Sequence, residues 1–298
     1  MLSESRPLAQ NSFMFEFIYD EKDVVFSNEL LFEGEFSRPV PRQRVILNGW
    51  KLSPFDFQDI GRICSQLLEL HIDFCLFSTQ SLESIRGLTQ IKFLSMRKTV
   101  SITRNVAQIF GSWSHLEKLD ISENPVESQS FSVISVTCRK LKILWMQACE
   151  GLDDICLNRL GEMMLRFRAL KQVYLDDCTS FQNEGVLALL QNALNIISLA
   201  NTKCSTLSIA SLRKKNPTLT HLDIQRLEVT SSAFEWIAEG CPHLSYFNCS
   251  GCRALDYDSL HMIAKGCPSL QTLDVSSCDR LTDDGIARAL LAMDRELR

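Results

Sequence analysis

The residues best able to do chemistry in this sequence are its cysteines, twelve among 298 residues. Two of them, Cys249 and Cys252, form a C-x-x-C motif, the spacing that zinc sites and dithiol redox centres use. A tetrahedral zinc site needs two further ligands. The sequence has neither a second C-x-x-C motif nor a pair of histidines at ligand spacing. We therefore interpret both cysteines as packing residues.

Other catalytic signatures do not occur in the sequence either. It contains no phosphate-binding glycine loop, no G-x-S-x-G and no H-E-x-x-H. The five histidines are spread along the chain without metal-ligand spacing. Adjacent acids, such as Asp153 and Asp154, fall at expected turns and helix starts, where helix capping explains them. We therefore expect no catalysis, no cofactor and no metal.

The elements that position these residues follow from a repeated pattern, L-x-x-L-x-[LIV]-x-x-C. It occurs in nine-residue segments such as "LQTLDVSSC" at Leu270, "LKQVYLDDC" at Leu170 and "LKILWMQAC" at Leu141. Counting a degenerate first copy at Arg42, ten copies begin 24 to 29 residues apart. This is the period of a leucine-rich repeat, which is about 20–29 residues.

Each repeat combines two hydrophobic periods. Positions 4 and 6 of the nine-residue segment alternate with polar positions, which predicts a short strand with one buried face. Between segments, stretches such as "SSAFEWIAEGC" have apolar residues at three- and four-residue steps, which predicts an amphipathic helix. The predicted fold is therefore an α/β solenoid. Its concave face is a parallel sheet and its convex face is covered by helices.

Most cysteines fall in phase with this repeat, at position 9 or three residues before the next segment. Buried free thiols behave as small hydrophobic groups. A disulfide framework is typical of short secreted chains, whereas this chain is long. We therefore expect reduced cysteines in a reducing compartment, the cytoplasm or the nucleus. The N-terminal "MLSESRPLAQ" also lacks the pattern of a secretion signal.

Composition and charge exclude further classes of function. The sequence has no apolar run of 18 residues, so we expect no membrane-spanning helix. A net charge of −5 argues against non-specific nucleic-acid binding, which requires a clustered basic surface.

The candidate binding residues are those at positions 3 and 5, which face away from the core on the concave side. Trp145 and Tyr174 occupy position 5 of neighbouring repeats and are expected to stand side by side. Clustered aromatic residues of this kind concentrate binding energy, so we expect a protein partner on this face. The expected apolar partner-binding residues are Phe93, Ile143, Trp145, Tyr174, Ile196 and Tyr246.

Acidic residues interleave with these aromatics. Asp120, Asp176 and Asp223 are expected to take part in binding, and Asp73 and Asp274 lie in the same rows. A basic or mixed partner segment suits this charge better than an acidic one. The alternative is that the N-terminal segment or a terminal tail of the chain folds over the aromatic residues and covers them.

The two ends of the chain differ from the repeats. Residues 1–41 do not match the pattern, and "SFMFEFIY" and "DVVFSNELLFEGEF" predict strands, so we interpret this segment as a partly β N-terminal cap. Residues 42–298 form the predicted repeat domain. It ends in "DDGIARALLAMDRELR", an amphipathic helix that is expected to close the solenoid.

The segments "CPHLSYFNCSGC" and "CPSLQTLDVSSCDRLTDDGI" resemble the cysteine-containing subclass of leucine-rich repeats. That subclass is typical of F-box/leucine-rich-repeat proteins, and the resemblance covers about residues 42–298. The resemblance implies a right-handed horseshoe. It also implies a substrate-recognising component of an SCF-type ubiquitin ligase, with cullin-RING ligase subunits as partners. The F-box of that family is not recognisable in residues 1–41, where Gly34, Pro39 and Pro41 interrupt any helix. A stand-alone interaction scaffold or inhibitor is therefore the alternative.

Overall fold

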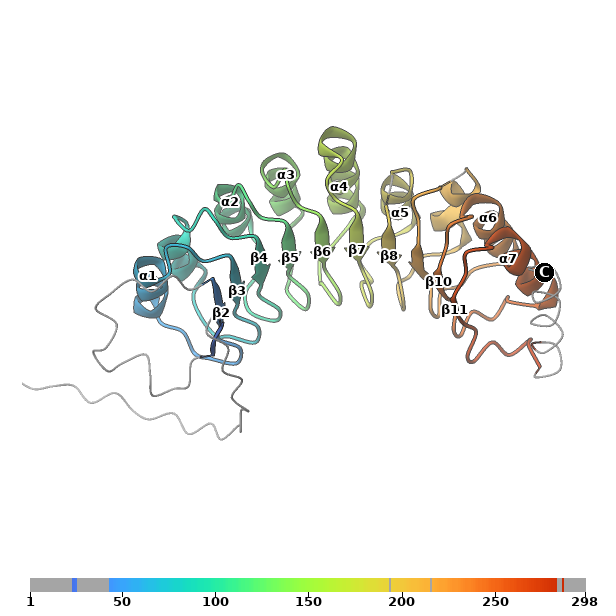
Figure 1. Ribbon diagram of the computed structural model, residues 1–298, viewed down its shortest axis with the longest axis horizontal. Coiled ribbons are helices and arrows are strands. Elements are labelled where there is room, and N and C mark those ends of the chain that lie inside the picture. The colour runs from blue at the N-terminus through green and yellow to red at the C-terminus, as the bar shows by residue number, and fades with distance from the viewer. Residues whose placement is uncertain (1–22, 26–42, 193, 215, 283–285, 287–298) are drawn as a thin grey trace, which may run out of the picture.

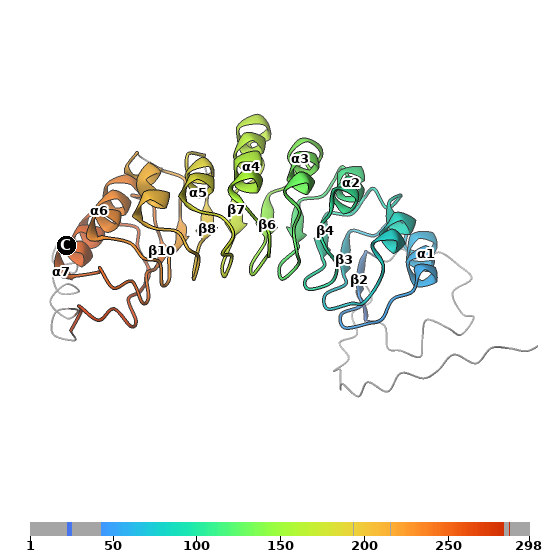
Figure 2. The ribbon, with the colours of Figure 1, turned by 180° about the vertical axis from the view of Figure 1, so that it is seen from behind.

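The computed structural model describes residues 23–25, 43–192, 194–214, 216–282 and 286. Their strands form one parallel sheet of eleven strands, in which each strand pairs with the next along the chain. Figure 1 shows these strands along the inner side of an arc and the helices along its outer side, and the view from behind shows the same layers (Figure 2). The predicted leucine-rich-repeat solenoid is thereby confirmed.

Ten strands occupy positions 3 to 5 of the ten nine-residue segments. In most of them the middle residue is buried and its two neighbours are partly accessible, as the alternating pattern predicted. The ten strands are β2 (Arg44–Ile46), β3 (Glu69–His71), β4 (Phe93–Ser95), β5 (Lys118–Asp120), β6 (Ile143–Trp145), β7 (Gln172–Tyr174), β8 (Ile196–Ser198), β9 (His221–Asp223), β10 (Tyr246–Asn248) and β11 (Thr272–Asp274).

An eleventh strand, β1 (Asp23–Val25), lies before the predicted repeats and pairs in parallel with β2, with Asp23 opposite Arg44. It falls within "DVVFSNELLFEGEF", one of the two stretches predicted to be extended. The other stretch, "SFMFEFIY", lies outside the described residues. The interval of 21 residues from Asp23 to Arg44 is within the range of leucine-rich-repeat periods. The assignment of residues 1–41 as a cap stays a prediction.

Helices connect the strands on the convex side. Several begin at polar side chains that cap the helix: Ser53 forms a capping box with Asp56, and the carboxylate of Asp256 accepts a hydrogen bond from the Ser259 amide. The helices are α1 (Pro54–Ile63), α2 (Arg104–Ser112), α3 (Ser128–Thr137), α4 (Asp154–Phe167), α5 (Asn183–Leu190), α6 (Ser231–Gly240) and α7 (Tyr257–Gly266).

Two details differ from the simple expectation of one short α-helix per repeat. The second and seventh repeats carry 3₁₀ helices instead, η1 (Thr79–Ile85) and η2 (Thr206–Arg213). The four extra residues of the fifth repeat lengthen α4 to 14 residues, so that it projects beyond its neighbours (Figure 1). The predicted C-terminal helix at 283–298 lies outside the described residues, apart from Ile286.

A second ladder of hydrogen bonds continues the stack where the strands end. The eighth residue of all ten segments has a positive φ, from 49° at Lys98 to 81° at Gly49. This conformation turns its amide toward the next repeat, as where Ala148 donates to the Asp176 carbonyl at 2.7 Å. Only two of the ten are glycines. The left-handed conformation costs the other residues about 1 kcal/mol or more each, which the added bond offsets.

The cysteines lie within the core, as predicted, and all twelve are free and buried. The thiols at position 9 have equivalent partners. Each donates a hydrogen bond to the backbone carbonyl of position 6 in the preceding repeat. Cys178, for example, donates to Met146 at 2.9 Å, and Cys252 donates to Ile224 at 3.2 Å. Asn124 takes the place of cysteine in the fourth repeat and donates to Met96 at 2.8 Å. Small donor side chains at position 9 therefore link one repeat to the next.

Candidate functional site

The predicted pair of aromatic residues is present on the concave face. Trp145 and Tyr174 are register partners on β6 and β7, and their rings stack with centroids 5.7 Å apart and planes at 12°. Phe93, two strands before Trp145, extends the row with a ring distance of 5.9 Å. These three rings, which we call the aromatic row, come from repeats spread over more than 80 residues of sequence.

The aromatic row remains partly accessible to solvent. All three residues are half-buried, and so are Ile143 and Ile196, which lie at position 3 on β6 and β8. Residues one position along each strand, such as Leu144 and Val173, are fully buried in the core. The sheet therefore separates a packed face from a face on which large apolar groups stay available for contact.

Tyr246 does not join the aromatic row. It lies on β10 and stacks instead on His221 of β9, with ring centroids 5.7 Å apart. At the other end, His71 packs edge-on against Phe93 at 4.8 Å. Burial lowers the pKa of His71, although the charges of Asp73 and Glu69 act against this. Metal-ligand spacing does not predict either contact. The positions of His71 and His221 in their nine-residue segments, 5 and 3, do place both side chains on the concave face.

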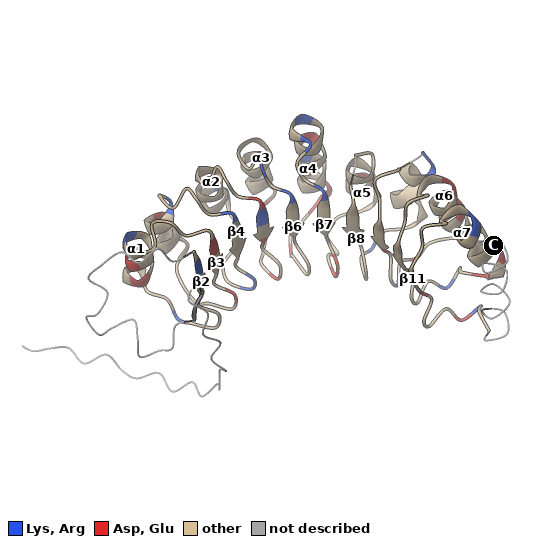
Figure 3. Ribbon diagram, viewed as in Figure 1, with Lys and Arg blue, Asp and Glu red and all other residues tan. Residues whose placement is uncertain are grey.

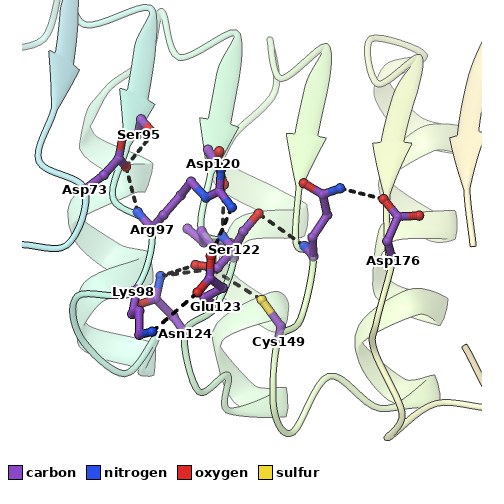
Figure 4. Close-up of polar contacts among 12 residues, drawn as sticks. Asp73, Ser95, Arg97, Lys98, Asp120, Ser122, Glu123, Asn124, Cys149 and Asp176 are labelled. Carbon is purple, nitrogen blue, oxygen red and sulfur yellow. Dashed lines mark hydrogen bonds and ion pairs between the residues drawn. The ribbon is translucent and has the colours of Figure 1, made fainter. Parts of the chain in front are cut away.

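The acidic residues of this face also have roles within the fold. The backbone amide at position 7 does not take part in the hydrogen bonds between strands. In most repeats it donates instead to a nearby carboxylate or amide side chain. Asp120 accepts from Ser122 at 3.0 Å, and Asp223 accepts from Gln225 at 2.9 Å. Figure 4 shows Asp120 and its neighbours on the central strands. The sequence interpretation treated these carboxylates only as partner-binding groups and overlooked this structural role.

Asp176 has the largest set of internal partners among the predicted site residues. It accepts hydrogen bonds from the Ser198 hydroxyl, from the Ala200 amide at 3.1 Å and from the Gln147 side chain at 2.5 Å. These partners come from the repeats on either side of it. Its carboxylate therefore links three repeats, and it lies two residues after Tyr174 in the chain.

Burial shifts the pKa values of several groups on this face. It raises the pKa values of the Asp120 and Asp223 carboxyls, and it raises the pKa of Tyr174, with the Asp176 charge adding to the effect. The rise is opposed at Asp120 and Asp223 by the hydrogen bonds that their carboxylates accept.

The thiols are poorly suited to nucleophilic or metal chemistry. Burial raises the pKa of Cys149 and of Cys252 to about 12, and it also raises that of Cys249. A thiolate is the reactive and metal-binding form of cysteine, so these groups stay neutral at ordinary pH. Within the described residues, no three His, Cys, Asp or Glu side chains gather in a way that would hold a metal ion.

No helix in the described part of the chain is both long enough and apolar enough to cross a bilayer.

Comparison with known proteins agrees with this architecture. Residues 266–287 match the family described as "Leucine Rich repeat". No curated protein matches the sequence. Among solved structures, a plant ice-binding protein is 17% identical with a TM-score of 0.51, and the match covers 78% of this chain and 71% of that one. An internalin (inlF) from Listeria monocytogenes is 12% identical with a TM-score of 0.52, and 84% of each chain is covered.

A third structure, the Rad7 and Elc1 complex in yeast, is 17% identical and covers 83% of this chain and 79% of that one, with a TM-score of 0.39. The first two structures support the solenoid fold. At their low sequence identity they show nothing about a binding partner.

Proposed function

We propose that this chain is a non-catalytic leucine-rich-repeat protein that binds a protein partner on its concave face. The aromatic row carries the proposal. Its rings lie on the solvent side of the sheet, whereas the core on the other side is already filled by leucine, isoleucine and cysteine. Half-buried aromatic groups in a hollow surface are the usual anchors of protein interfaces.

A more specific form of the proposal is that the chain recognises substrates for an SCF-type ubiquitin ligase, in the cytoplasm or the nucleus. Its support is the resemblance of residues 241–252 and 267–286 to the cysteine-containing repeat subclass. The buried thiols that give this subclass its pattern make the inter-repeat hydrogen bonds described above. A stand-alone scaffold or inhibitor would use the same aromatic row without ligase subunits.

Affinity purification with mass spectrometry tests both forms. Wild type is compared with the variant Trp145→Ala/Tyr174→Ala, and the matched control is Ile155→Ala/Leu165→Ala, which removes two exposed apolar side chains from the convex helix α4. We expect a stoichiometric partner with wild type and with the control, and its loss with the concave variant.

The identity of the recovered proteins separates the alternatives. Co-purification of a cullin and its adaptor supports the ligase form, and a single partner without ligase subunits supports the scaffold form. Equal recovery of all partners by wild type and the concave variant contradicts the proposal that the aromatic row is the binding site.

A further inference from the structure

The central repeats carry a positive edge where their strands begin. Between the end of each helix and the start of the next strand, residues 113–118, 138–143 and 168–172 contain six basic residues and one acidic residue, Glu117. Figure 3 shows blue segments where these strands start. Within a chain of net charge −5, this is a local concentration of positive charge. The six are Lys118, Arg139, Lys140, Lys142, Arg168 and Lys171.

The single acid of this edge is already paired. Lys142 Nζ lies 2.7 Å from Glu117 Oε2, and both side chains are substantially exposed. The hydrogen bond from Lys142, followed by the charges of Lys92 and Lys118, lowers the pKa of Glu117. One carboxylate surrounded by three ammonium groups leaves the edge with excess positive charge, which extends to the exposed Lys140 and Arg168.

The opposite ends of the same strands are negative. Residues 120–125, 145–150 and 174–179 contain five acids and no Lys or Arg. They are Asp120, Glu123, Glu150, Asp176 and Asp177. Glu123 is balanced by Arg97 at 3.0 Å and Lys98 at 3.7 Å, both from the preceding repeat. Asp120 lies two residues after Lys118, and Asp176 lies five residues after Lys171, which is about 7 Å and about 17 Å along an extended chain.

The apolar part of the hollow lies between these two edges. Lys142 lies directly before β6, which contains Ile143 and Trp145, and Asp177 lies three residues after Tyr174, the last residue of β7. In the direction of the strands, the central repeats therefore change from positive before the strands, through aromatic on the strands, to negative after them.

From this order we infer the chemistry and orientation of the partner, an inference that rests on the proposed function. We propose that the hollow binds an extended protein segment in which acidic residues, an apolar residue and basic residues follow in sequence. The acidic end lies at Lys140 and Arg168, the apolar side chain contacts Trp145 and Tyr174, and the basic end lies at Asp176 and Asp177.

A peptide fits this surface better than a nucleic acid does. A nucleic-acid backbone carries negative charge along its whole length, so phosphates that contact the basic edge would bring others close to Asp120 and Asp176. The Debye length is about 8 Å at physiological ionic strength, so repulsion from phosphates lying directly on these acids would be felt. A protein segment can reverse its charge within a few residues and match both edges.

The test is a selection of random 12-residue peptides displayed on phage, with the full chain as bait. We expect enriched peptides to carry acidic residues on one side of an apolar residue and basic residues on the other. The variant Lys140→Glu/Arg168→Glu is expected to lose the acidic preference at least tenfold in enrichment while keeping the apolar preference. Asp177→Lys is expected to weaken selection at the basic end only.

The matched control is Arg253→Glu/Lys265→Glu, which reverses two exposed charges away from the central repeats and should leave the enriched motif unchanged. Circular dichroism confirms that each variant is folded. A labelled single-stranded DNA 20-mer is expected not to displace a selected peptide, and displacement would overturn the choice of a peptide partner.

Two negative results have different meanings. Enriched peptides that depend on Trp145 and Tyr174 but lack the ordered charges overturn this inference and leave the proposed function standing. If nothing is enriched, or if the enriched peptides bind Trp145→Ala/Tyr174→Ala equally well, the inference of an extended peptide is overturned, and the proposed function then depends on the affinity purification alone.

Discussion

The Asp73 carboxylate accepts a 2.8 Å hydrogen bond from the backbone amide of Arg97, which lies 24 residues later in the next repeat. The same oxygen accepts the Ser95 hydroxyl at 2.6 Å. Asp73 is buried, so both donors have a fixed partner in the surface between two repeats (Figure 4). An acid that looks like a surface recognition group from the sequence is therefore part of what holds neighbouring repeats in register.

The first prediction concerns this bond. Asp73→Ala leaves the Ser95 hydroxyl and the Arg97 amide without their acceptor, and we expect it to lower the free energy of unfolding by about 1–3 kcal/mol. Urea denaturation measures the change. Glu150→Ala, an exposed carboxylate near the end of β6, is the control and should change stability by less than about 0.5 kcal/mol. Equal values for the two variants would show that the Asp73 bond contributes nothing.

The second prediction separates the two faces of β6. Leu144→Ala empties a fully buried site, and we expect it to cost about 2–5 kcal/mol. Trp145→Ala removes a half-buried ring whose stacking on Tyr174 contributes about 0.5–1.5 kcal/mol, so its total cost should be clearly smaller. Urea denaturation of both variants decides the point. A larger loss for Trp145→Ala would mean that the aromatic row serves folding rather than binding.

The third prediction concerns the close approach of one helix to the preceding repeat. A Cβ added at Gly240, the last residue of α6, would lie 1.5 Å from the backbone carbonyl oxygen of Leu212. Since the backbone cannot yield as a flexible side chain does, we expect Gly240→Ala to lower stability by at least about 1–3 kcal/mol. Gly87→Ala, where nothing lies within 4 Å, is the control. Thermal unfolding followed by circular dichroism should show a lower midpoint for Gly240→Ala alone.

The fourth prediction is a dependence of stability on pH. The buried thiols of Cys149 and Cys178 have pKa values raised to about 12, whereas an unfolded cysteine titrates near 8.5. The folded state therefore holds protons that the unfolded state releases, and stability is complete below about pH 8.5 and falls as pH rises toward 12. Urea denaturation at pH 7.5, 9 and 10 should give decreasing free energies of unfolding.

Cys149→Ala/Cys178→Ala is the control for this effect, because it removes two of the titrating thiols. Its stability should fall less steeply between pH 9 and 10 than that of wild type. A parallel decline in the two proteins would assign the pH dependence to other groups.

Much of the fold follows from local pattern. The spacing of the nine-residue segments correctly predicts ten strands, because each segment carries its own alternation of buried and accessible residues. The position of Cys149 and Cys178 in that pattern also predicts their burial. The nine-residue pattern does not include β1, since residues 23–25 carry no leucine or cysteine of the motif; the strand there is predicted only from the apolar stretch that begins at Asp23. It also does not distinguish the 3₁₀ helices from the α-helices, because both bury apolar residues at similar spacing.

The candidate site, like the fold, could be predicted from the sequence only in part. Position alone correctly places Trp145 beside Tyr174, because parallel strands in register bring equal positions of neighbouring repeats together. It does not place Tyr246, which stacks on His221, or reveal that His71 packs against Phe93. The sequence also does not predict the structural role of Asp120 and Asp176, because their carboxylates accept hydrogen bonds from backbone amides at position 7, and such bonds do not depend on the side chains of the donor residues.

The sequence by itself determined the solenoid, its repeat length, the buried thiols and the side chains that face the hollow, because each repeat encodes these locally and pairs only with its neighbours. Only the tertiary structure decided which of those side chains meet. Phe93 and Trp145 belong to strands two apart, about 9.6 Å by strand spacing. Their rings nevertheless lie 5.9 Å apart, because the conformations of these two large side chains, which the repeat spacing does not specify, bring the rings together.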